Sequence, residues 1–349
     1  MTSANESNEI QASSARPARS GRWRKWLLRT VLLLVGLVIA AELVARFGFG
    51  LGNPPLHMRD DLAVYMFKPS QEMTRFGHHI KINEYAMRSD DFPKEKSSNE
   101  EVRVLMLGDS VINGGAPMDQ REVVSELLQK RLAADLQRKV IVGNASEGGW
   151  GPVNELGWVR KYGFLNSDLL VLVLSSHDWD NMPDMPVGMV TFPDRKPLFA
   201  LQEVALRYLP RLLNSAAPDS EQGLETPPVD FDHESNIKKC LAAVDGLMVL
   251  AQQESLPVVV ALNLTPQELK TGAERGHREL RQVVERHDAH VVVIDEAYRK
   301  VLAAGGNPFR DDIHPNAAGH AAMAETLRPA ILEELRLRGY DTVTAPKSR

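Results

Sequence analysis

Five short apolar runs rich in β-branched residues alternate with stretches of helical spacing, and this alternation constrains the fold more than any other feature. The runs cover 102–107, 140–142, 169–174, 258–264 and 291–294, and apolar residues recur at helical spacing over 121–136, 154–162, 236–253, 274–286 and 316–338. Strands that are apolar throughout are typical of a parallel sheet covered on both faces by helices. The sequence therefore predicts a three-layer α/β domain with a five-stranded parallel sheet over residues 102–338.

The N-terminal part of the chain is typical of a membrane anchor. Residues 1–25 are polar and then basic, which predicts a disordered cytoplasmic tail. Residues 26–47 carry an apolar run near the length of about 20 residues that a helix needs to cross a bilayer. Positive charge before such a run favours a cytoplasmic N-terminus, with the chain after it on the other side of the membrane. We therefore predict a single-pass protein whose main domain is extracytoplasmic.

Two other interpretations of residues 26–47 stay open at this point. A buried core helix would have a similar composition, but a basic cluster seldom flanks one at the extreme N-terminus. A secretory signal would end at a small-x-small cleavage site, and no clean site of that kind follows the apolar run. An uncleaved anchor is the interpretation that the sequence favours.

Two segments do not fit the strand–helix alternation. Residues 48–101 are poorly patterned and form a predicted connector between the anchor and the domain. Residues 181–235 are rich in proline and form a predicted insertion, with a helix over 198–214. This insertion is either a surface excursion or a lid over a substrate site. Residues 339–349 are predicted to be a C-terminal tail.

Charge and cysteine content exclude several classes of function. The formal net charge of −5 argues against a nucleic-acid partner held mainly by charge. Cys240 is the only cysteine, which excludes a disulfide framework and a cysteine-rich zinc site. A metal site built from His177, Asp178, Asp180 and Asp184 matches neither zinc nor EF-hand spacing, so we expect no metal and no cofactor.

Polar residues or glycines directly follow three of the predicted strands. The carboxyl ends of parallel strands share one edge of the sheet, so these residues should gather there. Ser110 follows the first strand at a strand-to-helix turn, Gly149 follows the second, and His177 follows the third. Asp311 and His314 precede the last predicted helix with the spacing Asp-x-x-His. Each feature alone also fits an ordinary helix cap or loop. Together they predict an active site at this edge.

These residues have the chemistry of nucleophilic catalysis. Asp311 can accept the Nδ1 proton of His314, which leaves Nε2 free to take the proton of Ser110. The N–H groups of Ser110 and Gly149, with the ring of His177, would hold the oxyanion that forms when Ser110 attacks a carbonyl. We therefore expect Ser110, His314 and Asp311 to be neighbours in space.

The sequence also resembles a known family. Gly108-Asp109-Ser110-Val111 resembles the first block of the GDSL lipases and esterases, also called SGNH hydrolases, and Asp311 with His314 resembles the last block. Asn144 with Gly149 resembles the second block. The resemblance implies a flavodoxin-like sheet of order 2-1-3-4-5 and ester hydrolysis through a serine acyl-enzyme. It implies supporting roles for Asp109, Asn144 and Asp178.

The third block departs from the family pattern. The family has Gly-x-Asn-Asp there, and this chain has Ser175-Ser176-His177-Asp178. Three outcomes are open: His177 replaces the asparagine as oxyanion donor, Asn181 supplies the donor, or the oxyanion hole is incomplete. Losing one donor typically costs a factor of about 10²–10³ in rate.

The sequence thus predicts a membrane-anchored serine esterase that acts outside the cytoplasm on an ester-bearing small molecule, lipid or glycan, with O-acetyl groups among the candidate substrates. An acyltransferase acting on a cell-surface polysaccharide would use the same triad. A non-catalytic glycan-binding or assembly protein on the same fold is a third alternative.

Overall fold

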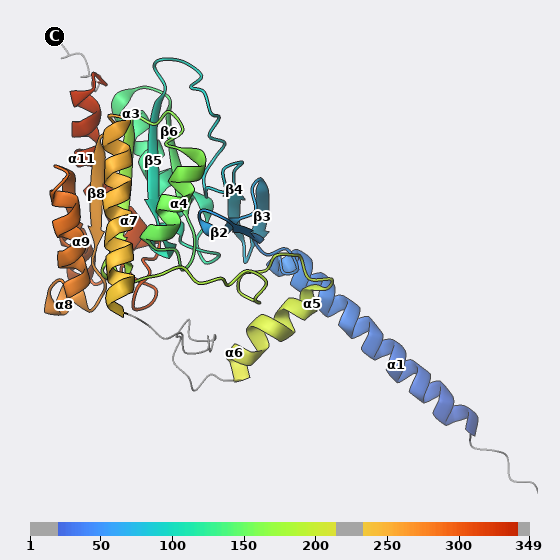
Figure 1. Cartoon of the computed structure of the whole chain (residues 1–349). Helices are drawn as coiled ribbons and strands as arrows, with labels where there is room; N and C mark the ends of the chain where they lie inside the picture. The colour runs from blue at the N-terminus through green and yellow to red at the C-terminus, as the bar shows by residue number, and fades with distance from the viewer. Residues whose placement is uncertain (1–19, 214–232, 341–349) are drawn as a thin grey trace, which may run out of the picture.

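A parallel five-stranded sheet forms the centre of the computed structural model, which describes residues 20–213 and 233–340 (Figure 1). The strand order is β6-β5-β7-β8-β9 and all neighbouring pairs are parallel. The strands are β5 (Val102–Gly108), β6 (Val140–Ser146), β7 (Leu169–Ser175), β8 (Val258–Asn263) and β9 (His290–Ile294). Numbered along the chain, this is the order 2-1-3-4-5, so the predicted flavodoxin-like fold is confirmed.

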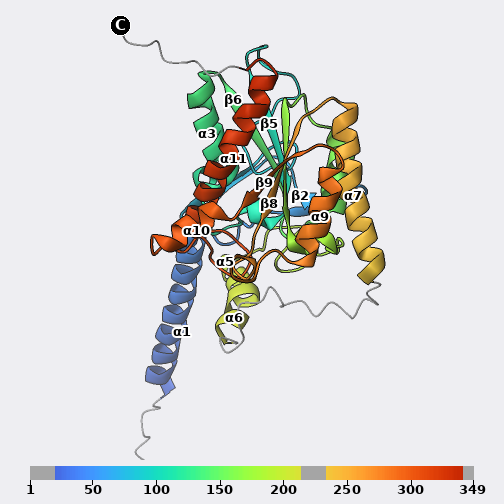
Figure 2. The same cartoon turned by 90° about the vertical axis from the view of Figure 1, so that its left-hand side faces the viewer.

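The strands are buried on both faces because alternate side chains point to opposite sides. Leu105 and Leu107 pack on the side of one group of helices, whereas Val104 and Met106 pack on the other. Figure 2 shows both layers. The first group is α4 (Pro152–Tyr162), α7 (His233–Gln253) and α9 (Arg275–Glu285); the second is α3 (Val124–Leu136), α10 (Glu296–Ala303) and α11 (Ala317–Leu337).

The connector contains more structure than the sequence indicates. Two antiparallel hairpins lie within it, β1 (His57–Asp60) with β2 (Val64–Phe67) and β3 (Gln71–Arg75) with β4 (His78–Ile82). Tyr65, Met66 and Ile80 are at most 2 % exposed and join the hydrophobic core on the α4 side of the sheet. Sequence analysis did not predict the hairpins because their strands are only four or five residues long, which is too short to show a clear alternation of apolar and polar residues.

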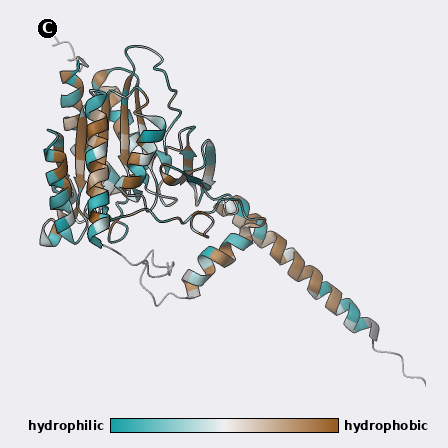
Figure 3. Cartoon of the chain, in the orientation of Figure 1, coloured by the Kyte–Doolittle hydropathy of each residue, from teal (hydrophilic) through white to brown (hydrophobic). Residues whose placement is uncertain are grey.

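The N-terminal helix stands away from this domain (Figure 1). Helix α1 (Ser20–Leu43) continues through a π-helical turn, η1 (Val44–Gly48). Because α1 begins at Ser20, residues 20–25 of the predicted tail are helical. Residues 1–19 of that tail lie outside the described residues. The span Arg22–Gly48 is long and apolar enough to cross a membrane, and none of its most apolar window is buried against the protein. Figure 3 shows that α1 consists largely of hydrophobic residues.

The insertion leads back to the base of this helix. After β7 and the short helix η3 (Ser176–Trp179), the chain runs to a continuous helical segment. That segment consists of α5 (Ala200–Glu203), the π-helical turn η4 (Val204–Tyr208) and α6 (Leu209–Leu213). Helix α5 contacts η1 and α1, so the predicted helix at 198–214 is present within 200–213 and packs against the end of the apolar helix.

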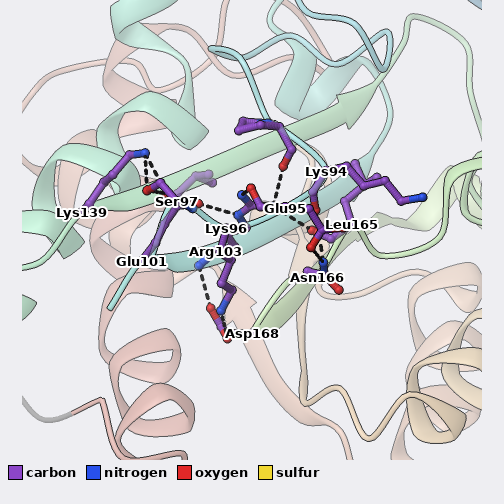
Figure 4. A network of polar contacts seen from close by, with 12 residues as sticks. Lys94, Glu95, Lys96, Ser97, Glu101, Arg103, Lys139, Leu165, Asn166 and Asp168 are labelled. Atoms are coloured by element: carbon purple, nitrogen blue, oxygen red, sulfur yellow. Dashed lines mark hydrogen bonds and ion pairs between the residues drawn. The ribbon is translucent and has the colours of Figure 1, made fainter. Parts of the chain in front are cut away.

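A closed polar network occupies the amino end of β5 (Figure 4). Arg103 and Glu101 are both fully buried, and the Arg103 Nε atom donates to Glu101 Oε1 at 2.7 Å. The Arg103 guanidinium also donates to the carbonyl oxygens of Pro93, Glu95 and Leu165. The Arg103 backbone N–H donates to Asp168 Oδ2 at 2.8 Å.

Several smaller elements differ from the prediction. Strand β6 runs on to Ser146, so Asn144 lies inside the strand rather than after it. Helix α10 and the short helices α2 (Ser110–Asn113) and α8 (Glu268–Thr271) are additional to the predicted helices. The predicted helix 121–136 is divided into a short helix, η2 (Gln120–Glu122), and α3. Tyr340, in the predicted C-terminal tail, donates a hydrogen bond from its hydroxyl to Asp168. The remainder of that tail lies outside the described residues.

Candidate active site

Ser110 lies at the sharp turn where β5 ends and α2 begins. Asp109 caps the helix, since its side chain accepts a hydrogen bond from the Val111 N–H at 2.8 Å. Gly108 suits the close packing on the strand side, since a Cβ there would lie 3.2 Å from the Val173 carbonyl oxygen and 3.0 Å from the Ile112 side chain. This turn leaves the Ser110 side chain partly exposed at the carboxyl edge of the sheet.

His314 meets Ser110 across 204 residues of sequence. The Nε2 atom of His314 lies 2.9 Å from the Ser110 Oγ atom. The Nδ1 atom of the same ring lies 2.9 Å from both carboxylate oxygens of Asp311. The structure therefore places hydroxyl, imidazole and carboxylate in hydrogen-bonding series, as the spatial prediction requires. The His314 side chain is 6 % exposed, so the protein surrounds most of the ring.

The loop that carries His314 is held by contacts from both sides. Phe309 and Pro315 form an isolated antiparallel bridge, and the Arg310 N–H donates to the His314 carbonyl at 3.0 Å. The Arg310 side chain donates to the Gly114 carbonyl at 2.7 Å, which joins this loop to the end of α2. The loop that carries His314 is thus attached to the helix that begins with Ser110.

Asp311 is held in its charged form. Partial burial would by itself raise the pKa of this carboxyl group, but hydrogen bonds from the backbone N–H groups of His314 and Ile313 outweigh that effect. The pKa of Asp311 therefore lies below its usual value. A charged carboxylate here fixes the Nδ1–H tautomer of His314 and directs Nε2 toward Ser110.

Gly149 lies in the loop after β6, on the strand that neighbours β5. Its φ of +72° is in the region that favours glycine, and a Cβ would lie 3.0 Å from the Tyr65 hydroxyl. Tyr65 donates from that hydroxyl to the Gly148 carbonyl at 2.7 Å, and its carbonyl accepts from the Trp150 ring N–H. A residue of the connector therefore shapes the glycine loop.

A second contact from the connector supports the same loop. His57 Nε2 lies 3.3 Å from Glu147 Oε2, and both side chains are about 5 % exposed or less. Burial raises the pKa of Glu147, while the nearby His57 opposes the rise. The first hairpin thus closes one side of the loop that carries Gly149.

The His177 side chain contacts Asp109. Its Nε2 atom, the predicted oxyanion donor, lies 2.7 Å from Asp109 Oδ2 and 3.9 Å from Asp178 Oδ1. The imidazole is therefore hydrogen-bonded to the residue immediately before Ser110. This contact ties the end of β7 to the Ser110 turn.

Three buried carboxyl groups gather behind His177. Asp178 is fully buried, and its Oδ2 atom accepts from the Ser175 N–H at 2.7 Å, while Oδ1 has no hydrogen-bond partner among the described residues. Neither carboxyl oxygen of Glu155, at the start of α4, has a partner among those residues. Burial, with the charges of Asp178 and Asp109, raises the pKa of Glu155 well above its usual value. Burial also raises the pKa of Asp178, against the effect of His177.

The two asparagines named in the sequence analysis, Asn144 and Asn181, make different hydrogen bonds near the site. Asn144 is buried in β6, and its Nδ2 atom donates to the Ile112 carbonyl at 3.0 Å, so it holds α2 against the sheet. Asn181 donates from Nδ2 to the Trp150 carbonyl at 2.8 Å. Asn181 therefore binds the glycine loop through this hydrogen bond.

Asp109, His177 and Asp178 form a group of side chains that could hold a metal ion. One ligand atom from each lies within 4.8 Å of the others, so the set has the size of a cation site. The His177 and Asp109 atoms are, however, in direct hydrogen-bonding contact at 2.7 Å. That geometry fits a direct hydrogen bond between the two side chains, which needs no bridging cation.

Sequence analysis missed several residues that support the site. Tyr65 and His57 lie in the connector, and Arg310 lies beside the predicted Asp311. Arg88 is fully buried and donates to the carbonyl oxygens of Asn113, Gly115 and Met118 around the end of α2. Arg310 could have been found from its place in the motif, whereas the others lie in segments without a recognisable pattern.

A hydroxyl, an imidazole and a carboxylate in series at the carboxyl edge of a parallel sheet define a class, the hydrolases with a serine nucleophile. The comparison with protein families makes the assignment specific. The chain belongs to the GDSL-like lipase/acylhydrolase family, whose model matches residues 106–322. The enzyme class is therefore that of the carboxylic ester hydrolases.

Solved structures of related folds include several esterases. TesA is 18 % identical, with 66 % of this chain and 99 % of that chain covered and a TM-score of 0.43. A lipase/acylhydrolase from Enterococcus faecalis is 14 % identical, with coverages of 67 % and 96 % and a TM-score of 0.40. The acetylxylan esterase Axe2 from Geobacillus stearothermophilus is 16 % identical, with coverages of 68 % and 94 % and a TM-score of 0.40. No curated protein sequence matches this chain significantly.

Proposed function

We propose that this chain is a membrane-anchored serine esterase that hydrolyses acyl esters through Ser110, His314 and Asp311. The observation that carries the proposal is the series from Ser110 Oγ to His314 Nε2 and from His314 Nδ1 to Asp311, at 2.9 Å for each link. A hydroxyl is a weak nucleophile at neutral pH unless a base removes its proton as it attacks. This series supplies that base and the group that orients it.

The reaction has two halves. His314 takes the proton of Ser110 as the Oγ atom attacks the ester carbonyl, and it then gives that proton to the departing alcohol oxygen. The product of this half is an acyl group bonded to Ser110. Water then attacks the acyl carbonyl, with His314 again as the base, and the acid is released as Ser110 regains its proton.

The developing oxyanion requires hydrogen-bond donors near Ser110. We assign the backbone N–H groups of Ser110 and Gly149 to this role, because Ser110 begins a helix and Gly149 follows the adjacent strand at the same edge. His177 lies on the Asp109 side of the same turn. Its contact with Asp109 supports a role in fixing the turn.

The location of the enzyme follows from the apolar helix. We propose that α1 crosses a membrane with the basic N-terminal residues in the cytoplasm, so that the hydrolase domain lies outside it. Esters that such a domain can reach include lipids and the O-acetyl groups of envelope glycans. An acceptor sugar in place of water would make the same acyl-enzyme a transferase.

A substitution at Ser110 tests the proposal. In Ser110→Ala, the hydrolysis of short p-nitrophenyl esters by the purified full chain in detergent should fall by a factor of about 10⁴ or more, because the nucleophile is lost. The control is Ser98→Ala, an exposed serine at the opposite end of β5, which should keep the wild-type rate. Equal turnover by Ser110→Ala and the native chain would refute the assignment.

A further inference from the structure

We propose that the helical segment 200–213 lies in the membrane interface beside the end of α1 and forms a second lipid contact. The proposal rests on the assignment of α1 as a membrane anchor. Its partner is the headgroup region of a bilayer, which accepts a helix with one apolar face lying parallel to the membrane surface. Three separate features of this segment support it.

The first feature is an apolar surface that the protein does not cover. Leu206, Leu209 and Leu212 recur every three residues, and they are 56 %, 45 % and 70 % exposed. Residues three apart lie on one side of a helix. Leu198 and Phe199, immediately before the segment, are 82 % and 61 % exposed. Soluble surfaces rarely gather so many large exposed apolar side chains unless they contact a partner or a membrane.

The second feature is a polar connection between this segment and the end of α1. Glu42 accepts hydrogen bonds from the Ala200 and Leu201 N–H groups at 2.8 and 2.9 Å. Arg46 pairs with Glu42 at 2.9 Å and donates to the Leu198 carbonyl at 3.2 Å. If α1 crosses the bilayer, its last turn lies at the bilayer surface, and these bonds hold the start of segment 200–213 at the same level.

The first two turns of the segment are fixed to the protein. Glu203 is 6 % exposed, pairs with the buried Arg75 at 2.5 Å, and accepts a hydrogen bond from the Gly52 N–H at 2.7 Å. Leu201, Val204 and Tyr208 pack on the small apolar cluster that includes Ala45. These contacts hold the segment on the hairpins and the anchor, and they leave the side chains of Leu206, Leu209 and Leu212 uncovered by the protein.

The third feature is a group of exposed aromatic side chains at this level. Phe47, Phe49 and Phe76 are 79 %, 50 % and 41 % exposed, and the ring of Phe76 meets that of Tyr208 in the segment at 5.8 Å. Aromatic side chains are enriched where a membrane protein crosses from lipid to water. Figure 1 shows α6 and α1 leaving this region in different directions, and Figure 3 shows apolar residues on both.

Depth measurements on single-cysteine variants test the proposal. Cys240 is buried and is replaced by alanine, and a fluorophore is attached to Leu212→Cys in the full chain reconstituted into phosphatidylcholine–phosphatidylglycerol vesicles. Val35→Cys, on α1, is the control for the bilayer interior. Glu333→Cys, exposed on α11, is the control for water. A lipid carrying a nitroxide on its acyl chain quenches labels in the membrane, and iodide quenches labels in water.

The proposal expects the nitroxide lipid to quench Leu212→Cys several-fold more than Glu333→Cys, and iodide to show the reverse order. Iodide quenching equal to that of Glu333→Cys would overturn it, and so would protection from both quenchers, which would indicate a contact between copies of the chain. If Val35→Cys escapes the nitroxide lipid, the anchor and this proposal fail together. Ester hydrolysis in detergent is measured separately, so the catalytic assignment stands or falls on its own result.

Discussion

The two ends of β5 show opposite ways of burying charge. At the amino end, Arg103 and Glu101 are fully buried, and the Arg103 side chain donates to Glu101 and to carbonyl oxygens around it (Figure 4). At the carboxyl end, Asp109, Asp178 and Glu155 are buried near one partly exposed imidazole, and three of their oxygens lack a hydrogen-bond partner among the described residues. Both ends belong to the same strand and the same core.

The pKa values follow this difference. Burial opposes ionisation of Glu101, but hydrogen bonds from Lys139, Ser97 and Arg103 outweigh it and lower its pKa to about 2. At the other end burial and neighbouring negative charge both raise the pKa of Glu155. Buried groups with complete partners stabilise a fold, whereas incompletely paired ones gather where a protein performs chemistry. The comparison therefore separates a structural end of the sheet from a reactive end.

The largest effect on stability is expected at the amino end. Arg103→Met removes the cation and leaves Glu101 buried beside fewer donors, which should cost about 3–5 kcal/mol in the free energy of unfolding. Chemical denaturation of the full chain in detergent measures this loss. The rate of ester hydrolysis per folded molecule should stay near that of the wild type. A large fall in that rate, with stability unchanged, would break the distinction between the two ends.

A smaller effect, on activity rather than stability, is expected at His177. His177→Ala leaves Asp109 without its partner beside the Ser110 turn, and kcat/KM should fall by a factor of about 10² because the nucleophile is positioned less accurately. His177→Asn restores the family residue and should lie within about tenfold of the wild type, because an amide can donate to the same carboxylate. Steady-state kinetics on a soluble ester distinguish the two variants. If the alanine variant retains the wild-type rate, the contact with Asp109 has no role in catalysis.

The smallest effects concern pH, and they have opposite signs at the two ends. Because the pKa of Glu155 is raised in the folded chain, the unfolded chain releases the Glu155 proton at a lower pH than the folded chain does. The contribution of Glu155 to the free energy of unfolding is therefore lost as pH rises above about 4.5, by at most about 1.4 kcal/mol per pH unit. Glu155→Gln should therefore gain stability over the wild type between pH 5 and 8. The lowered pKa of Glu101 has the reverse consequence, since its contribution is lost as pH falls from about 4.5 toward 2.

Unfolding curves of Glu155→Gln and Glu101→Gln across this pH range measure both trends. Glu101→Gln should be less stable than the wild type at pH 7 and approach it in acid. Curves that shift in the same direction with pH for both variants would contradict the comparison.

The sequence predicted the sheet and the meeting of Ser110 with His314 for one physical reason. In a parallel sheet all strands end at the same edge, so residues that follow different strands become neighbours whatever their separation in sequence. The same reasoning placed Gly149 and His177 at that edge. It required only the ends of the strands, which the apolar runs indicated to within a few residues.

The parts that the sequence did not predict depend on contacts without a local pattern. Tyr65 and His57 reach the glycine loop from short hairpins whose residues do not alternate clearly. Glu101 precedes the first apolar run and Arg103 lies within it, and no spacing in the sequence indicates that the two side chains pair. The orientation of His177 toward Asp109, rather than toward an oxyanion, is set by side-chain packing that no spacing rule describes.

The central claim is that His314 activates Ser110 as a nucleophile, and a fluorophosphonate probe tests it most directly. The native full chain is treated with the probe in detergent, and the modified peptide is mapped by mass spectrometry. The account predicts a single adduct on the Ser110 Oγ atom, abolished by prior denaturation of the protein. An unmodified Ser110 in folded protein, or an adduct on another serine, would contradict it.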